Sequence, residues 1–257
     1  MLKNKIALVT GASSGIGLAC ARSFAGEGLR LILAARRIKR LENLASELKD
    51  EFGTETHLLE LDVRDRESVN AAVEGLPEAW RDIEILVNNA GLSRGLDKLH
   101  EGYYLDWDEM IDTNIKGLLW ISRAVLQGMV ERDRGHVINI GSIAGHQVYA
   151  GGNVYCATKH AVGALTQGLR LDLVGTKIRV SSVDPGLVQT EFSEVRFRGD
   201  TDKADPVYQN FPPLQAIDIA ETVLFCATRP PHVNIQDVLI MPQDQAAVYA
   251  SHPRGTD

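Results

Sequence analysis

The sequence predicts an α/β protein with one doubly wound domain, built on a parallel sheet of seven strands with helices on both faces. Short apolar runs rich in β-branched residues alternate with longer amphipathic segments along the chain. Within these runs apolar residues follow one another instead of alternating with polar residues, which is typical of strands buried on both faces. No linker, low-complexity segment or repeat divides residues 1–257, so we expect a single domain.

Each strand is expected where such an apolar run occurs. The runs are residues 5–10, 30–35, 56–63, 83–91, 136–142, 178–186 and 234–242. The segments between them have helical spacing, as in residues 40–52, where Leu41, Leu44 and Leu48 recur three or four positions apart. Strands separated by helices run parallel in most folds, so a parallel sheet follows.

One connection breaks this alternation. Residues 188–214 are polar and contain Pro206, Pro212 and Pro213 between a strand and the next helix. A connection this long in a compact domain is usually a lid or a binding segment. We therefore predict a loop that covers the substrate.

Composition excludes several classes of protein. The 27 Lys and Arg against 34 Asp and Glu give a net charge of -7, which disfavours a nucleic-acid partner. The N-terminus lacks the apolar core of a signal peptide, and no run approaches the roughly 18 apolar residues of a membrane span. Three widely spaced cysteines suit reduced thiols, and His146 and His160 have no second ligand at a metal-like spacing. We expect a cytoplasmic protein without a membrane segment or a metal site.

A glycine-rich turn follows the first strand. The motif TGASSGIG places Gly11, Gly15 and Gly17 between that strand and a helix. Such glycines let the backbone approach a pyrophosphate, which then binds at the helix N-terminus. No lysine follows the last glycine, which argues against an ATP-binding loop. The motif predicts a Rossmann-type dinucleotide site, to which Ser13, Ser14 and Ile16 also belong.

The next strands indicate which dinucleotide binds. The second strand ends in Arg36 and Arg37, where an NAD site usually has an acid for the ribose hydroxyl. Two guanidinium groups suit a 2′-phosphate, which predicts NADP, although they could also be the solvated start of the next helix. Further cofactor contacts are expected after the third and fourth strands, from Asp62, Val63, Asn89, Ala90 and Gly91.

Tyr155 and Lys159 are four positions apart on an expected helix, and so share one face. A phenol with a pKa of about 10 is a poor acid–base catalyst at neutral pH unless its anion is stabilised, which a nearby lysine would do. Ser142, just after the fifth strand, could hydrogen-bond a carbonyl oxygen. The Tyr–Lys pair alone is common by chance. Together with Ser142 and the glycine turn, it predicts proton exchange during hydride transfer.

These motifs resemble the short-chain dehydrogenase/reductase family over residues 5 to about 242. The resemblance implies that Lys159 binds the nicotinamide ribose and lowers the pKa of Tyr155, the proton donor or acceptor. It also implies that Ser142 orients the substrate, and that Asn114 distorts its helix and holds a water for proton relay. The resemblance also implies cofactor contacts on the nicotinamide side, from Pro185, Gly186, Val188 and Thr190.

Within that family, the stretches TEFSEVRFRGD and HVNIQDVLIMP resemble NADP-dependent 3-hydroxy acid dehydrogenases of the serine and allo-threonine type. This implies a small 3-hydroxy acid, such as serine, allo-threonine, or 3-hydroxypropionate with its product malonic semialdehyde. It also implies a homotetramer built through the helices around residues 108–130 and 152–174. Residues 99–110 depart from the pattern, as does GHQVYAG with Gln147, and both stretches are expected to alter the substrate pocket.

Arg196, in the long loop, is the expected partner of a substrate carboxylate, because a guanidinium grips a carboxylate with paired bonds. Gln147 is a second candidate for substrate contact. Two other functions stay open. The first is an NADPH-dependent reductase of uncharged ketones or acyl thioesters. The second is a non-catalytic NADP-sensing regulator, which would have no need of the four catalytic residues.

Overall fold

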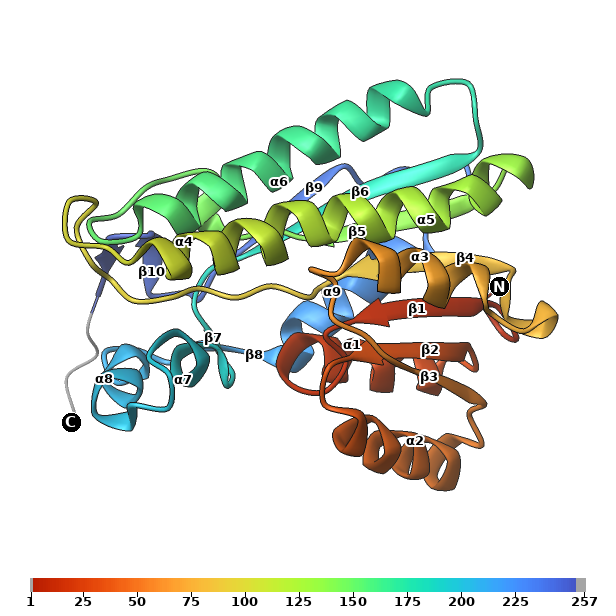
Figure 1. The fold of residues 1–257 in the computed structure, drawn as a ribbon, viewed down its shortest axis with the longest axis horizontal. Helices are drawn as coiled ribbons and strands as arrows, with labels where there is room; N and C mark the ends of the chain where they lie inside the picture. Colours follow the sequence, from red (N-terminus) through yellow and green to blue (C-terminus); the bar gives the residue numbers. More distant parts are fainter. Residues whose placement is uncertain (1, 253–257) are drawn as a thin grey trace.

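Seven parallel strands form the central sheet of the computed structural model, which describes residues 2–252 (Figure 1). Their order is β3-β2-β1-β4-β5-β6-β9, and all six pairings are parallel, as predicted. The strands are β1 (Ile6–Thr10), β2 (Arg30–Ala35), β3 (Thr56–Glu60), β4 (Ile83–Asn88), β5 (Gly135–Ile140), β6 (Ile178–Pro185) and β9 (Asp237–Ile240).

Helices cover both faces of this sheet, which confirms the doubly wound α/β fold (Figure 1). One face packs against α1 (Gly15–Gly26), α2 (Ile38–Phe52) and α9 (Ala216–Thr228). The other packs against α3 (Arg66–Glu74), α5 (Leu118–Glu131) and α6 (Asn153–Asp172), and α4 (Tyr104–Ile111) precedes α5. No helix within residues 2–252 combines the length and apolarity needed to cross a membrane.

The apolar strands explain this arrangement. All five residues of β1 are buried, with Ala7 and Val9 facing one helical layer and Ile6 and Leu8 the other. Burying a side chain the size of leucine or isoleucine contributes roughly 1.5–3 kcal/mol, so a strand that is apolar on both faces requires helices on both sides. α2 matches its predicted pattern, with Leu41, Leu44 and Leu48 buried.

The sheet order reverses next to β1, since β2 lies on one side of it and β4 on the other. The connection after β1 leads to β2 on one side, and the connection after β4 leads towards β5 on the other side. A crevice therefore opens between β1 and β4, beyond the carboxyl ends of the strands. The glycine turn follows β1 at this edge, and Asn89 follows β4. The fold therefore brings the predicted motifs to one edge of the sheet.

Residues 188–215, here termed the cap, are more ordered than the predicted loop. The cap contains β7 (Val188–Gln189), α7 (Phe192–Arg196), α8 (Thr201–Ala204), a 3₁₀ turn (Asp205–Tyr208) and β8 (Leu214–Gln215). β7 and β8 pair in parallel and close the base of the cap. Its helices are only four or five residues long, too short to give a helical period in the sequence. A second unpredicted feature is the hairpin of β10 (Gln245–Ala247) and β11 (Ala250–Ser251).

Candidate active site

A cavity of about 530 Å³ lies at the carboxyl edge of the sheet, between the glycine turn, α6 and the cap. It brings together nearly all predicted site residues. Gly17, Asn114 and Gln147 are the predicted residues that do not line it. Those that do are Gly11, Ser13, Ser14, Gly15, Ile16, Arg36, Arg37, Asp62, Val63, Asn89, Ala90, Gly91, Ser142, Tyr155, Lys159, Pro185, Gly186, Val188, Thr190 and Arg196.

Hydrogen bonds between Thr10 and Asn89, which directly follows β4, fix the start of the glycine turn. Asn89 donates from Nδ2 to the carbonyl of Thr10 over 2.9 Å, and the Thr10 hydroxyl accepts from the backbone N–H of Asn89 at 3.0 Å. Gly11 has φ +66°, and a Cβ there would lie 2.8 Å from Asn89 Nδ2. Asn89 thus supports the turn, and the missing side chain leaves the backbone accessible to a pyrophosphate.

Arg37 extends over the glycine turn. Its Nε and Nη2 donate to Ser13 Oγ at 3.1 and 3.0 Å, and Nη2 also donates to Ser14 Oγ at 2.6 Å. Its Nη1 donates to Glu191 of the cap at 2.9 Å. A guanidinium at this position suits a phosphate beside the second strand.

Asp62, the predicted adenine contact, bonds to a neighbouring arginine. Its carboxylate accepts from Arg64 Nη2 over 2.6 Å. Partial burial raises the pKa of Asp62, but the hydrogen bonds and charge of Arg64 outweigh this, so the pKa lies below its ordinary value. Asp62 is therefore an anion on the cavity wall at neutral pH.

Tyr155 and Ser142 lie together in the buried part of the cavity. Tyr155 lies on α6, and Ser142 precedes a 3₁₀ turn (Ile143–Gly145) and accepts the N–H of Ala144 at 3.1 Å. Burial and the nearby Tyr149 raise the pKa of Tyr155, whereas Arg196 and Ser142 act in the opposite direction. The pKa of Tyr155 therefore lies above its ordinary value, because desolvation of the phenolate is the largest effect. Lys159 is not among the groups that shift it here, and its predicted effect on Tyr155 stays a prediction.

Lys159 is also buried, on the same helical face as Tyr155. Its Nζ lies 5.9 Å from the centre of the Tyr155 ring and donates to the carbonyl of Ile140 over 2.9 Å. Burial lowers the pKa of Lys159 to about 8, and the carboxylate of Asp184 opposes that shift. The ammonium group is thus held at the cavity wall, close to its titration point at neutral pH.

Asp184 is a buried acid near Lys159 that the sequence motifs did not predict. It is 5% exposed, and its carboxylate accepts from Ser182 Oγ at 2.5 Å and lies 2.7 Å from His146 Nε2. A Cβ on Gly141 would collide with this carboxylate, so only glycine fits beside it. Its position directly before the predicted Pro185 and Gly186 was the available signal.

Asn114 lies in a π-helical turn (Asp112–Gly117) between α4 and α5. This is the helix distortion that the sequence resemblance implied. Asn114 Nδ2 donates to the carbonyl of Leu92 at 2.8 Å and to Thr158 Oγ1 at 3.0 Å, and its Oδ1 accepts the N–H of Leu92 at 2.9 Å. The side chain therefore joins the segment after β4 to α6, behind the cavity wall.

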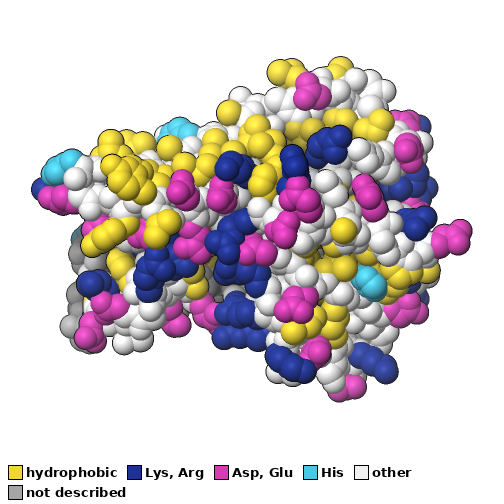
Figure 2. All heavy atoms as spheres, in the orientation of Figure 1, with side chains coloured by type: hydrophobic (Ala, Val, Ile, Leu, Met, Phe, Trp, Pro, Cys, Tyr) yellow, Lys and Arg dark blue, Asp and Glu magenta, His cyan; other side chains and the backbone are white. Residues whose placement is uncertain are grey.

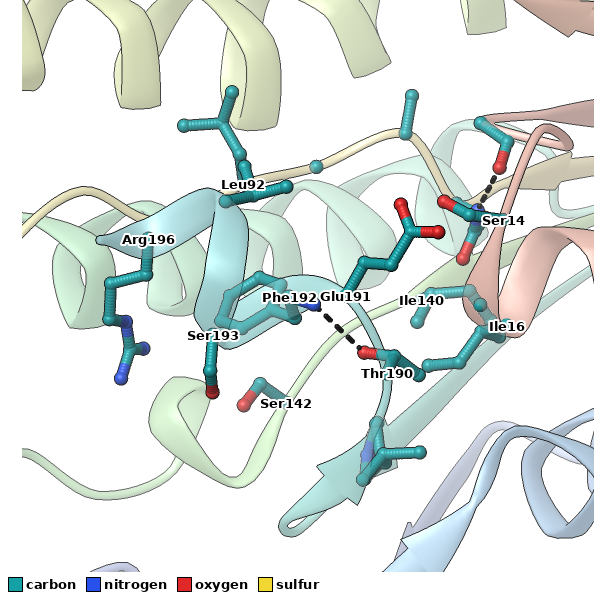
Figure 3. Close-up of a pocket in the computed structure, with 18 of the residues that line it drawn as sticks. Ser14, Ile16, Leu92, Ile140, Ser142, Thr190, Glu191, Phe192, Ser193 and Arg196 are labelled. Carbon is teal, nitrogen blue, oxygen red and sulfur yellow. Dashed lines mark hydrogen bonds between the residues drawn. The ribbon is translucent and has the colours of Figure 1, made fainter. Parts of the chain in front are cut away.

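Arg196 closes the cap side of the cavity (Figure 3). Its Nη2 donates to Tyr149 Oη at 3.1 Å, and its guanidinium carbon lies 5.6 Å from the Tyr155 ring centre and 5.2 Å from that of Phe192. Its Nε is buried and has no hydrogen-bond partner within the described part of the chain. Arg196 therefore places a cation at the cavity wall next to Tyr155.

Gln147 is not placed as predicted. Its Oε1 accepts the backbone N–H of Val248 at 2.9 Å, and the residue lies outside the cavity lining. Sequence proximity to Ser142 suggested substrate contact, but the turn after Ser142 directs the side chain to the C-terminal hairpin. Several residues that were not predicted line the cavity on the cap side, namely Tyr149, Leu187, Glu191, Phe192, Ser193, Val195, Val207, Tyr208 and Phe211.

Comparison with known proteins decides the family. A model of the short chain dehydrogenase family matches residues 5–200. The chain belongs to the short-chain dehydrogenase/reductase family. Its relatives in this family include an NADP-dependent 3-hydroxy acid dehydrogenase of Salmonella typhi, 51% identical over 94% of this chain and 96% of that protein.

Two further family members show how far the likeness extends. An NADP-dependent 3-hydroxy acid dehydrogenase of Schizosaccharomyces pombe is 46% identical over 95% of each chain. The closed form of a serine dehydrogenase complexed with NADP+ is 48% identical, with a TM-score of 0.90 over 97% of this chain and 100% of that one. The likeness to that structure covers the cap as well as the sheet.

Proposed function

We propose that the protein is an NADP-dependent oxidoreductase that interconverts the alcohol and carbonyl forms of a small 3-hydroxy acid. The observation that carries the substrate class is Arg196, whose guanidinium lines the cavity beside the Tyr155 ring. A carboxylate on the substrate would pair with this cation while its hydroxyl lies at Tyr155. The names of the relatives at about half identity support the same substrate class.

The residues of the cavity fit NADP. The open turn at Gly11 and the N-terminus of α1 suit the pyrophosphate, Arg36 and Arg37 the 2′-phosphate, and Lys159 the nicotinamide ribose. NADP supplies a hydride acceptor or, when reduced, a hydride donor. The serine dehydrogenase at a TM-score of 0.90 is complexed with NADP+, which supports this assignment.

In our proposal, Tyr155 exchanges the proton that accompanies hydride transfer. Burial raises its pKa, so the phenol is protonated at neutral pH and suited to donate to a carbonyl oxygen. In the oxidation direction, the charges of Lys159 and Arg196 stabilise the phenolate that accepts the hydroxyl proton. Ser142 donates a hydrogen bond to the same substrate oxygen and fixes its position.

The experiment compares a hydroxy acid with an uncharged alcohol of the same length. We expect Arg196→Ala to raise KM for 3-hydroxypropionate roughly 10- to 100-fold, and to leave KM for 1,3-propanediol unchanged, in NADP+-dependent oxidation followed by NADPH absorbance. Arg198→Ala is the matched control, because Arg198 is exposed and pairs with Asp106. Tyr155→Phe should lower kcat for both substrates at least about 100-fold.

Three other results of these measurements would contradict the proposed function. An unchanged KM for the acid in Arg196→Ala would remove the carboxylate assignment. Turnover of uncharged ketones alone would replace the hydroxy acid dehydrogenase by a carbonyl reductase. Tight NADPH binding without any turnover would indicate a regulator that senses the cofactor.

We further propose a homotetramer in the cytoplasm. Large apolar side chains are exposed on the α4–α6 layer, including Leu105 at 79%, Leu119 at 42% and Leu171 at 75% (Figure 2). Apolar surface of this kind favours contact with further copies of the chain. The free cysteines Cys20, Cys156 and Cys226 are all buried, which suits a reducing compartment.

A further inference from the structure

Glu191 connects the cap to Arg37 and Arg40, on the side of the cavity where the glycine turn lies. It immediately precedes α7, the helix that carries Arg196. Its carboxylate accepts from Arg37 Nη1 at 2.9 Å and from Arg40 Nη1 at 2.6 Å. Figure 3 shows Glu191 extending from the cap towards the side of the cavity where Ser14 lies. An acid of the cap is thus bound to a cation at the start of α2.

The hydrogen bonds of Arg37 leave little room for a second anion. Nε and Nη2 bond to Ser13 and Ser14, and Nη1 bonds to Glu191. A 2′-phosphate is recognised through paired N–H donors of the same kind. A phosphate bound at Nη1 would lie beside the Glu191 carboxylate, and two neighbouring anions on one guanidinium repel each other.

The solvent exposure of these side chains determines how strongly the Glu191 carboxylate can compete for Arg37. The side chains of Glu191, Arg37 and Arg40 are 36%, 42% and 47% exposed. Ion pairs at this exposure are individually weak, so the carboxylate is exchangeable and shifts affinity without abolishing it. Burial raises the pKa of Glu191, but the two arginines outweigh this and leave it below its ordinary value. The competing carboxylate is therefore charged at neutral pH.

We propose that Glu191 is a specificity-determining residue that competes with the 2′-phosphate of the cofactor for Arg37. This inference rests on the proposed function, in which Arg37 receives the 2′-phosphate. Glu191 weakens binding of any ligand that carries a 2′-phosphate, and has no such effect on ligands without one. Cofactor binding then replaces the Arg37–Glu191 ion pair by a pair between Arg37 and the phosphate, and Glu191 keeps its pair with Arg40.

The test uses two nucleotides that differ only in this group, adenosine 2′,5′-bisphosphate and AMP, with dissociation constants measured by calorimetry at fixed ionic strength. We expect Glu191→Gln to tighten binding of the bisphosphate roughly fivefold and to leave AMP unchanged. Glu194→Gln is the matched control. It removes the same charge three residues away, from an exposed position on α7. This control should change neither constant.

Arg37→Gln tests the phosphate site at Arg37 separately from the competition by Glu191. It should weaken the bisphosphate and not AMP if Arg37 holds the 2′-phosphate. If it does so while Glu191→Gln leaves bisphosphate affinity unchanged or lowers it, competition is overturned and the phosphate site stands. If Arg37→Gln affects both nucleotides alike, or neither, the phosphate assignment fails and the role of Glu191 fails with it.

Discussion

At the residue scale, Lys159 depends on the charge of Asp184. Burial lowers the pKa of Lys159 to about 8, and Asp184 acts against that shift. In Asp184→Asn the opposing charge is lost, so the pKa falls further and Lys159 loses its proton at a lower pH. We expect the alkaline limb of carbonyl reduction to move to lower pH, measured as kcat/KM against pH.

His146→Gln is the control for this prediction. It removes the histidine that lies 2.7 Å from Asp184 but leaves the carboxylate in place. The limb should then stay above that of Asp184→Asn. A profile of Asp184→Asn that coincides with the wild type would show that Asp184 does not set the charge of Lys159.

At the element scale, α7 is fixed by Arg94, which lies outside the cap. Arg94 Nη1 donates to the carbonyl of Val195, and its Nε and Nη2 donate to Glu109 at 2.7 and 3.1 Å. The adjacent Gly95 N–H donates to the carbonyl of Arg196 at 3.1 Å. The position of the Arg196 side chain therefore depends on a segment that follows β4.

Replacing this anchor should affect stability and substrate binding together. We expect Arg94→Ala to reduce the free energy of unfolding by about 1.5–3 kcal/mol, because bonds to the largely buried Glu109 are lost, and to raise KM for the hydroxy acid. Denaturant unfolding and steady-state kinetics measure the two effects. Arg66→Ala, which breaks an exposed pair with Glu67, should change neither. A lowered stability with unchanged KM would mean that α7 keeps its position without Arg94.

At the scale of the whole molecule, the exposed apolar residues of α5 and α6 test the proposed tetramer. We expect the wild-type protein to have four times the mass of one chain by light scattering, and the Leu119→Glu/Leu171→Glu variant to have a smaller mass, since charge at an apolar contact is costly. Phe52→Glu on α2, 41% exposed on the other helical layer, is the control. A wild-type monomer, or an unchanged mass in the double variant, would contradict this interface.

The sheet and the cofactor turn were predictable from sequence because both have local signals. Strands such as β1 are buried at every position and begin with four consecutive apolar residues, and the glycines of the turn are close together in the sequence. The short helices of the cap were not, since helices of four or five residues are stable only through tertiary contacts.

The long-range contacts that set the orientation and charge of the site residues could not be predicted from the sequence. Glu191 meets Arg37 across 154 positions, and Gln147 meets Val248 across 101. Asp184 is a further example, because its effect on Lys159 depends on burial that no motif records. Residue identity therefore predicted many of the groups that line the cavity, and the three-dimensional contacts determine their charge and orientation.

The parallel pairing of β7 with β8 has a consequence for how such a protein diversifies. Val188 lies opposite Leu214, so the chain leaves the body of the molecule and re-enters it one strand spacing away, about 4.8 Å. Within the segment between these points, Thr190 packs against Gly15 of the glycine turn and Glu191 bonds to Arg37, so both belong to the cofactor side of the cavity. Grafting a different segment between residues 192 and 213 is thus a direct route to new substrate ranges that keeps these two residues.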